Sequence, residues 1–422
     1  MALLAACGDS SLGGDAATHD ASGISDAGTG DGDVSDAGTD AGETGPLEVS
    51  YCSGQMAGYE LPEDPAQRGP WPVGARTVTV GDLTVEVWYP AARGSEAGLE
   101  LHVYDLREHL PDDQTVAESD SLKQPCDCYR DLPLDPEHGP YSPILFMHGF
   151  SGFRGQSLEL TTHWASRGFV VVAADHPSIG LKTFLTDGIG GLIFNLLLGG
   201  GLGSVYGDCD LSDYGGQRAE GIELLDALHS PQGDLAFLDG YIDTTRMGAA
   251  GHSAGGGAVA ALPGYAGVQV VAPMSMRGTC EGAETVSSLV MGGMADGIIA
   301  YSQTQDGYES SPSPKRLVGL TDAGHMAFTS FCPIGASEGG ILQAAQNAGV
   351  QFDAFFLSII EPLASDGCGP DALAPELGWA ATNFVTTAAF EERLLCLPER
   401  GHMLRRVLEF HPVAVGEFRE DP

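Results

Sequence analysis

Hydrophobic residues from position 75 onward alternate between continuous apolar runs and runs with helical spacing. Continuous runs are typical of strands that helices cover on both faces. Segments with apolar residues three or four positions apart predict amphipathic helices between them. We therefore expect an α/β protein with a mostly parallel, twisted sheet of about eight strands and helices on both faces. The expected strands are 75–80, 83–90, 143–148, 169–177, 246–253, 268–276, 288–296 and 316–325, and the expected helices include 158–168, 215–230 and 382–397.

Residues 49–422 are expected to form one domain, because neither a repeat nor a second strand series interrupts this pattern. Gly81-Asp82 separates the first two strands by two residues, the spacing of a β-hairpin. Two insertions lengthen the domain. Residues 91–140 are polar, whereas residues 178–209 are apolar and rich in glycine, without reaching the length of a membrane span.

The N-terminal segment predicts export. Leu4-Ala5-Ala6-Cys7 resembles a bacterial lipobox, so we expect residues 1–7 to be the remnant of a signal peptide and Cys7 to carry a lipid. Residues 8–48 repeat Asp, Ala and Gly with little to bury, which predicts a disordered acidic linker. The protein is therefore expected at the cell envelope as a bacterial lipoprotein, or secreted.

Charge and cysteine content limit which partners, covalent bonds and metal sites are expected. The net charge of −39 argues against nucleic acid as a partner. The chain has nine cysteines, and the eight besides Cys7 suit disulfides in an oxidising compartment. Cys126-Asp-Cys128 could instead suggest a metal site, but no zinc-type cluster lies near it in the sequence. We expect no metal, no cofactor and a monomer.

The first candidate for a catalytic motif is the pentapeptide Gly251-His252-Ser253-Ala254-Gly255. A G-x-S-x-G pattern is weak evidence in a chain with 60 glycines, so its context decides. Here a strand ends at the serine and a helix of small residues follows. A sharp strand-to-helix turn needs glycine on both sides and exposes the serine hydroxyl. Ser253 is therefore the candidate nucleophile, and the alternative is a serine that merely caps a helix.

A serine nucleophile needs a base, and the base needs an acid that orients it. Asp296 closes the strand 288–296, and His325 is the last residue of the expected strand segment 316–325. The chain order Ser253, Asp296, His325 suits a catalytic triad at one end of such a sheet. Asp322 lies three residues before His325 and is the alternative acid.

An oxyanion hole needs two N–H donors aimed at the developing negative charge. The backbone of Ala254, directly after the serine, would supply one. His148-Gly149 follows the third strand and lets the backbone turn toward Ser253, so that Phe150 would supply the other. His252 is expected to be a packed neighbour of this turn without a catalytic role.

Several stretches together resemble the α/β-hydrolase superfamily. Within it, the chain resembles the group of dienelactone-hydrolase-like esterases, platelet-activating-factor acetylhydrolases and cutinase-like polyester hydrolases. The resemblance implies hydrolysis of carboxylic esters through an acyl-enzyme, without a cofactor. It is carried by residues 69–91, 144–155, 163–177, 248–260 and 292–328.

The resemblance implies roles for individual residues. Ser253 would be the nucleophile, His325 the general base and acid, and Asp296 its orienting group. The N–H groups of Phe150 and Ala254 would form the oxyanion hole. His148, Gly149, Gly251, His252 and Gly255 would support these motifs.

The chain also departs from these families. Dienelactone hydrolases use a cysteine nucleophile, so their activity is not expected here. Polyester hydrolases usually carry a tryptophan where this chain has Met276 and Arg277. We expect Met276, Arg277 and Met326 to form a substrate wall. Residues 178–209 would be a lid or acyl-binding wall, or else a packed surface helix.

The sequence thus predicts a serine esterase acting on short to medium acyl or lipid-like esters, with a small-molecule or polymeric ester as its partner. One alternative is a lipase or a polyester depolymerase of the cutinase type. Another is a non-catalytic surface-binding protein that keeps the hydrolase fold. The complete Ser-Asp-His order argues against the non-catalytic alternative.

Overall fold

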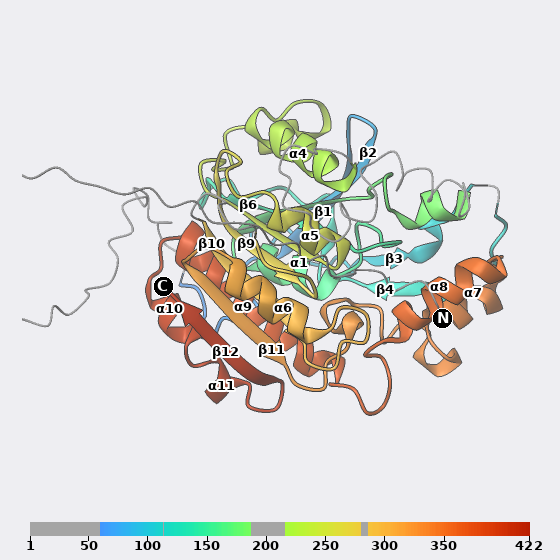
Figure 1. Ribbon diagram of the computed structural model, residues 1–422. Helices are drawn as coiled ribbons and strands as arrows, with labels where there is room; N and C mark the ends of the chain where they lie inside the picture. The colour runs from blue at the N-terminus through green and yellow to red at the C-terminus, as the bar shows by residue number, and fades with distance from the viewer. Residues whose placement is uncertain (1–59, 113, 187–215, 280–285) are drawn as a thin grey trace, which may run out of the picture. The chain divides into compact units, whose positions relative to one another are not determined.

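The computed structural model describes residues 60–112, 114–186, 216–279 and 286–422 (Figure 1). Its main feature is a ten-stranded sheet with the order β12-β11-β10-β9-β8-β6-β7-β2-β1-β5. The strands from β7 to β11 are parallel, and β2 and β12 join this parallel block in antiparallel orientation. The strands are β1 (Val73–Val80), β2 (Leu83–Pro90), β5 (Tyr129–Arg130), β6 (Ser142–Met147), β7 (Phe169–Ala174), β8 (Met247–His252), β9 (Val268–Met274), β10 (Ser287–Gly293), β11 (Lys315–Leu320) and β12 (Val415–Asp421).

The expected α/β architecture is confirmed, but the expected number of strands is wrong: the sheet has ten strands rather than eight. The eight expected strands all form, and β5 and β12 are additional edge strands. β5 is only two residues long and lies in the polar insertion. β12 has the sequence VGEFRED, whose charges suit the exposed edge of a sheet but lack the pattern of a buried strand.

Helices cover both faces of the sheet because alternate strand residues point to opposite sides. Ile144 and Phe146 of β6 belong to the buried cluster that includes residues of α1, α9, α10 and α11, while Leu145 and Met147 belong to the cluster that includes residues of α4 and α5. α6 covers Val290 of β10. The helices are α1 (Leu158–Ser166), α4 (Gly216–His229), α5 (Ala254–Ala260), α6 (Tyr301–Ser310), α9 (Pro375–Leu394), α10 (Glu399–Leu404) and α11 (Val407–Phe410).

A helical segment between β11 and α9 lies beside the polar insertion. It contains α7 (Ile341–Ala348) and α8 (Ala354–Ser365), seen near β3 and β4 in Figure 1. From the insertion come the strand pair β3 (Val103–Asp105) and β4 (Lys123–Pro125) and two short 3₁₀ helices, η1 (Leu106–His109) and η2 (Asp120–Leu122). Their apolar side chains pack against α7. We call residues 331–373 the cap segment.

Disulfides, expected from the cysteine count, are present. Cys126 is bonded to Cys128, which excludes a metal site at this pair, and Cys332 is bonded to Cys368. The second bond joins the two ends of the cap segment. It therefore encloses α7 and α8 in one covalent loop.

The expectations for residues 1–7, for the linker 8–48 and for Cys7 lie outside the described residues. So does most of the 178–209 insertion, of which residues 178–186 are described and residues 181–186 are helical. Among the described residues, no helix combines the length and apolar character needed to cross a bilayer.

Candidate active site

Ser253 lies in a sharp turn between β8 and α5. Its φ is +55°, a backbone conformation that few residues other than glycine adopt. The turn is possible only because its flanks have no side chains. A Cβ at position 251 would overlap the carbonyl of Gly255, and one at position 255 would overlap the carbonyls of Met147 and His148. The two glycines of the pattern are therefore explained by close backbone contacts.

Asp296 and His325 meet at the carboxyl ends of β10 and β11. Oδ2 of Asp296 lies 2.9 Å from Nδ1 of His325, and both side chains are almost fully buried. The other carboxylate oxygen accepts hydrogen bonds from the N–H groups of Ile298 and Ile299, each at 2.8 Å. Burial opposes ionisation of Asp296, but the hydrogen bonds from His325 and these N–H groups outweigh it and lower its pKa. The carboxylate is thus charged and fixed in place.

Asp322, the alternative acid, lies in a different environment. It is exposed, and its φ of +52° places it in a turn after β11. Its carbonyl accepts a hydrogen bond from the N–H of Leu373 at 2.8 Å. The geometry therefore favours Asp296 as the partner of the His325 ring.

The hydrogen bond to Asp296 determines which nitrogen of His325 is available. A carboxylate only accepts, so Nδ1 must carry the proton and the lone pair of neutral His325 lies on Nε2. Nε2 is buried and has no hydrogen-bond partner among the described residues. His325 and Ser253 line the same cavity. This arrangement can accept a proton from a serine hydroxyl when substrate binds.

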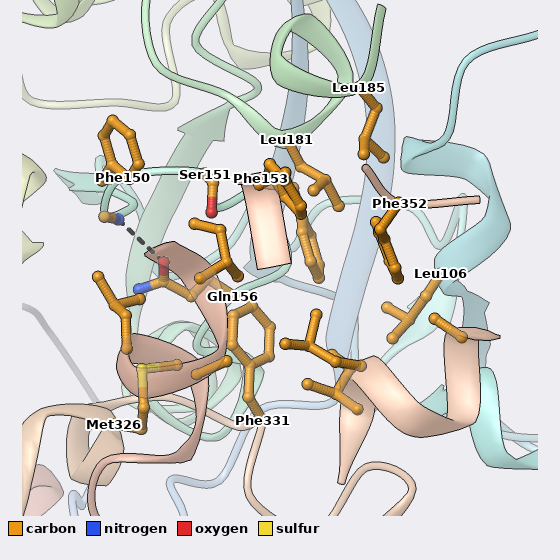
Figure 2. Close-up of a pocket in the computed structure, with 18 of the residues that line it drawn as sticks. Leu106, Phe150, Ser151, Phe153, Gln156, Leu181, Leu185, Met326, Phe331 and Phe352 are labelled. Carbon is orange, nitrogen blue, oxygen red and sulfur yellow. Dashed lines mark hydrogen bonds between the residues drawn. The ribbon is translucent and has the colours of Figure 1, made fainter. Parts of the chain in front are cut away.

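Gln156 and His252 connect three loops of the site. Oε1 of Gln156 accepts a hydrogen bond from the N–H of Gly149 at 2.9 Å (dashed line in Figure 2), and its amide nitrogen lies 3.1 Å from Nδ1 of His252. Nε2 of His252 lies 2.9 Å from the carbonyl of His325. Burial, with the charge of a protonated His325 as a smaller cause, lowers the pKa of His252 to about 3. His252 is therefore neutral, with Nδ1 accepting and Nε2 donating.

The loop after β6 lies against the serine turn. A Cβ at Gly149 would lie 3.1 Å from Cβ of Ser253, so glycine permits this close approach. The N–H groups of Phe150 and Ala254 donate no hydrogen bond to any described residue, which leaves them available for a substrate oxygen. The side chain of His148 helps to hold this loop in place. Its Nδ1 lies 2.8 Å from the carbonyl of Gly149, and Nε2 accepts from the N–H of His176 at 3.1 Å.

A cavity opens from Ser253 and His325 toward the cap segment. Apart from the groups at its catalytic end, its walls are apolar side chains. Figure 2 shows them converging from separate segments, including Leu106, Leu181, Phe331 and Phe352.

The expected substrate wall is only partly found. Met326 lines the cavity, whereas Met276 is buried beside α5 and Arg277 is exposed, and neither is among the described residues that line it. From the expected lid, Leu181 and Leu185 line the cavity. Most of the wall comes instead from α7, α8 and the polar insertion. No motif in the sequence of α7 and α8 indicates that these helices would face the cavity.

Residues 62–187 match the family model of platelet-activating factor acetylhydrolase, isoform II. The matched segment includes the Gly149–Phe150 loop and ends before Ser253. No curated protein matches the chain. The match covers less than a third of the chain, and over this segment it confirms the resemblance to platelet-activating factor acetylhydrolases inferred from the sequence.

Proposed function

We propose that this protein is a serine esterase in which Ser253, His325 and Asp296 form the catalytic triad. The observation that carries the proposal is the orientation of His325. Its Nδ1 is hydrogen-bonded to Asp296, its Nε2 has no partner among the described residues, and His325 lines the same cavity as Ser253. A histidine oriented by a buried carboxylate, with a free nitrogen beside a strained serine, suits general-base catalysis.

The reaction would proceed in two halves. Oγ of Ser253 attacks the ester carbonyl as Nε2 of His325 takes its proton, and the N–H groups of Phe150 and Ala254 stabilise the resulting oxyanion. The imidazolium gives its proton to the leaving alcohol, and an acyl-serine remains. Water then attacks this ester with the same proton transfers, which releases the acid and restores Ser253.

The cavity supports esters with an apolar acyl chain. Its apolar walls begin beside Ser253 and continue to Phe356 and Ile360 of α8. Burial of a chain there would contribute about 0.8 kcal/mol per methylene group. We therefore propose short to medium acyl or lipid-like esters as substrates. A polyester segment would have to enter the same cavity, so release of soluble acid from a polyester film, compared with tributyrin turnover, tests that alternative.

Active-site variants test the triad. We expect Ser253→Ala to lower kcat for p-nitrophenyl butyrate by roughly 10⁶-fold and Asp296→Asn by roughly 10⁴-fold. Asp322→Asn is the matched control, because it makes the same change in the exposed carboxylate near His325. A fluorophosphonate probe should label the wild type and leave Ser253→Ala unlabelled. Wild-type turnover by Ser253→Ala, or equal losses in the two aspartate variants, would contradict the proposal.

The N-terminal sequence supports a second, separate proposal: the enzyme is exported and anchored by a lipid on Cys7. Mass spectrometry of the mature protein tests it. A diacylglycerol-modified Cys7 as the first residue is the expected result, and an unprocessed Met1 would refute it.

A further inference from the structure

Asp366 joins the cap segment to the loops that carry the proposed acid and base. It follows directly after α8, whose residues Phe356, Ile360 and Leu363 line the cavity. Cys368, two residues later, is bonded to Cys332 at the other end of the cap segment. Asp366 therefore lies between the cavity-lining helix α8 and the loops at the carboxyl ends of β10 and β11.

The carboxylate of Asp366 accepts hydrogen bonds from two different loops. Oδ1 accepts from the backbone N–H of His325, and Oδ2 accepts from the N–H of Gly297 at 3.1 Å. The carbonyl of Asp366 also accepts from the N–H of Met326 at 2.9 Å. One residue thus holds the backbone of the proposed base and the residue next to Asp296.

Close packing shows that this contact is specific. A Cβ at Gly297 would overlap Oδ2 of Asp366, and a Cβ at Gly324 would overlap Oδ1. Both loops therefore have glycine where the carboxylate approaches. The ordinary alternative, a residue that only ends a helix, does not explain hydrogen bonds that leave α8 for two other loops.

We propose that Asp366 is a positioning residue that sets the distance between Asp296 and His325 and fixes the His325 ring toward Ser253. This inference rests on the proposed triad. It does not place Asp366 in contact with substrate, since it acts through the backbone of His325 and Gly297. Loss of such a restraint reduces the rate strongly, because a displacement of about 1 Å in a catalytic group can cost roughly 10²-fold.

The chain offers a matched control at the other end of α8. Asp353 caps the start of this helix and accepts hydrogen bonds from the N–H groups of Phe355 and Phe356, at 2.9 and 2.8 Å. Asp353→Ala and Asp366→Ala thus each remove a carboxylate bonded to two N–H groups beside the same helix. Only Asp366 reaches the loops of the triad.

Steady-state kinetics with p-nitrophenyl acetate and p-nitrophenyl octanoate test the proposal. Acetate is the diagnostic substrate, because its two-carbon acyl group is too short to depend on α8. We expect Asp366→Ala to lower kcat for acetate by about 10- to 100-fold with KM changed by less than about threefold. Asp353→Ala should keep kcat within about twofold of the wild type. Asp366→Asn should fall between the two alanine variants, since its one amide oxygen can accept from only one of the two N–H groups.

Other outcomes separate the possible failures. Equal kcat for the two alanine variants, or a loss confined to KM for octanoate, would overturn the positioning role and leave Asp366 as a support for the cavity wall. If Asp366→Ala fails to fold, Asp366→Asn decides the question by the same comparison. A wild-type protein that hydrolyses neither ester would refute the proposed function instead.

Discussion

The side chain of Gln156 is hydrogen-bonded to the Gly149 loop and to His252, and His252 is hydrogen-bonded to the carbonyl of His325. Replacement by glutamate is nearly isosteric and keeps the acceptor for Gly149. It removes the donor to Nδ1 of His252, so the proton of that imidazole is drawn from Nε2 to Nδ1. Nε2 would then present a lone pair to the His325 carbonyl, 2.9 Å away.

We therefore expect Gln156→Glu to lower kcat by roughly 10- to 100-fold, because the loop of the proposed oxyanion hole and the loop of the proposed base lose their common restraint. Gln124→Glu is the matched control. Gln124 is also buried and donates to the carbonyl of Gly155 at 3.1 Å, and it does not line the cavity. Equal kcat for the two variants, measured with p-nitrophenyl butyrate, would contradict a role for the Gln156–His252 connection.

Ser253, Asp296 and His325 could be proposed from sequence because each follows a strand whose place in the chain is visible. Gln156 and Asp366 could not. Gln156 is 96 positions from His252, and Asp366 is 41 positions from His325. Their partners are backbone groups or a histidine that come near only when strands and cap segment are assembled. A lone glutamine or aspartate has no pattern that points to such contacts.

At the scale of elements, α1 and α9 are joined by buried charges. Oε1 of Glu391 lies 2.7 Å from the guanidinium of Arg167, and Oε2 lies 2.7 Å from Arg400. Glu391 and Arg167 have no exposed side-chain surface. Burial raises the pKa of Glu391 and lowers that of Arg167, although their mutual attraction opposes both shifts.

Glu391→Gln is expected to reduce the free energy of unfolding by about 3–5 kcal/mol, since it leaves a buried guanidinium without its counter-charge. Urea unfolding followed by circular dichroism measures this. Glu409→Gln removes the partner of Arg406 in an exposed pair of α11 and should leave the free energy nearly unchanged. Similar losses in both variants would contradict the assignment of Glu391 as the essential partner.

The sequence predicted the buried elements better than the exposed ones. A strand buried on both faces is continuously apolar, and this is why β6 to β11 were anticipated. The edge strands β5 and β12 form because a neighbouring strand offers free hydrogen-bonding groups, not because of their own pattern. The position of the cap segment over the site depends on long-range packing, which no local sequence pattern indicates.

At the scale of the whole molecule, buried histidines predict sensitivity to mild acid. Burial, as the largest cause, lowers the pKa of His148, His163 and His252 to about 3 each, from an ordinary value of 6.5. Between these values the unfolded chain takes up protons that the folded protein does not. The free energy of unfolding therefore falls as pH decreases below 6.5.

With all three histidines protonated in the unfolded chain, the expected slope reaches about 4 kcal/mol per pH unit. Urea unfolding at pH 7, 6 and 5 measures it. His163→Asn should reduce the slope by about a third, and His402→Asn, at an exposed position, should leave it unchanged. A free energy that stays constant from pH 7 to pH 5 would show that these histidines titrate normally in the folded protein.

The positive φ of Ser253 places catalytic activity and stability of the fold in conflict at one position. The turn that exposes the hydroxyl holds a side chain at φ +55°, at a cost of about 1–3 kcal/mol. Ser253→Gly would relax this strain and remove the proposed nucleophile in a single change. Selection for stability of the fold alone would therefore favour glycine over serine at this position.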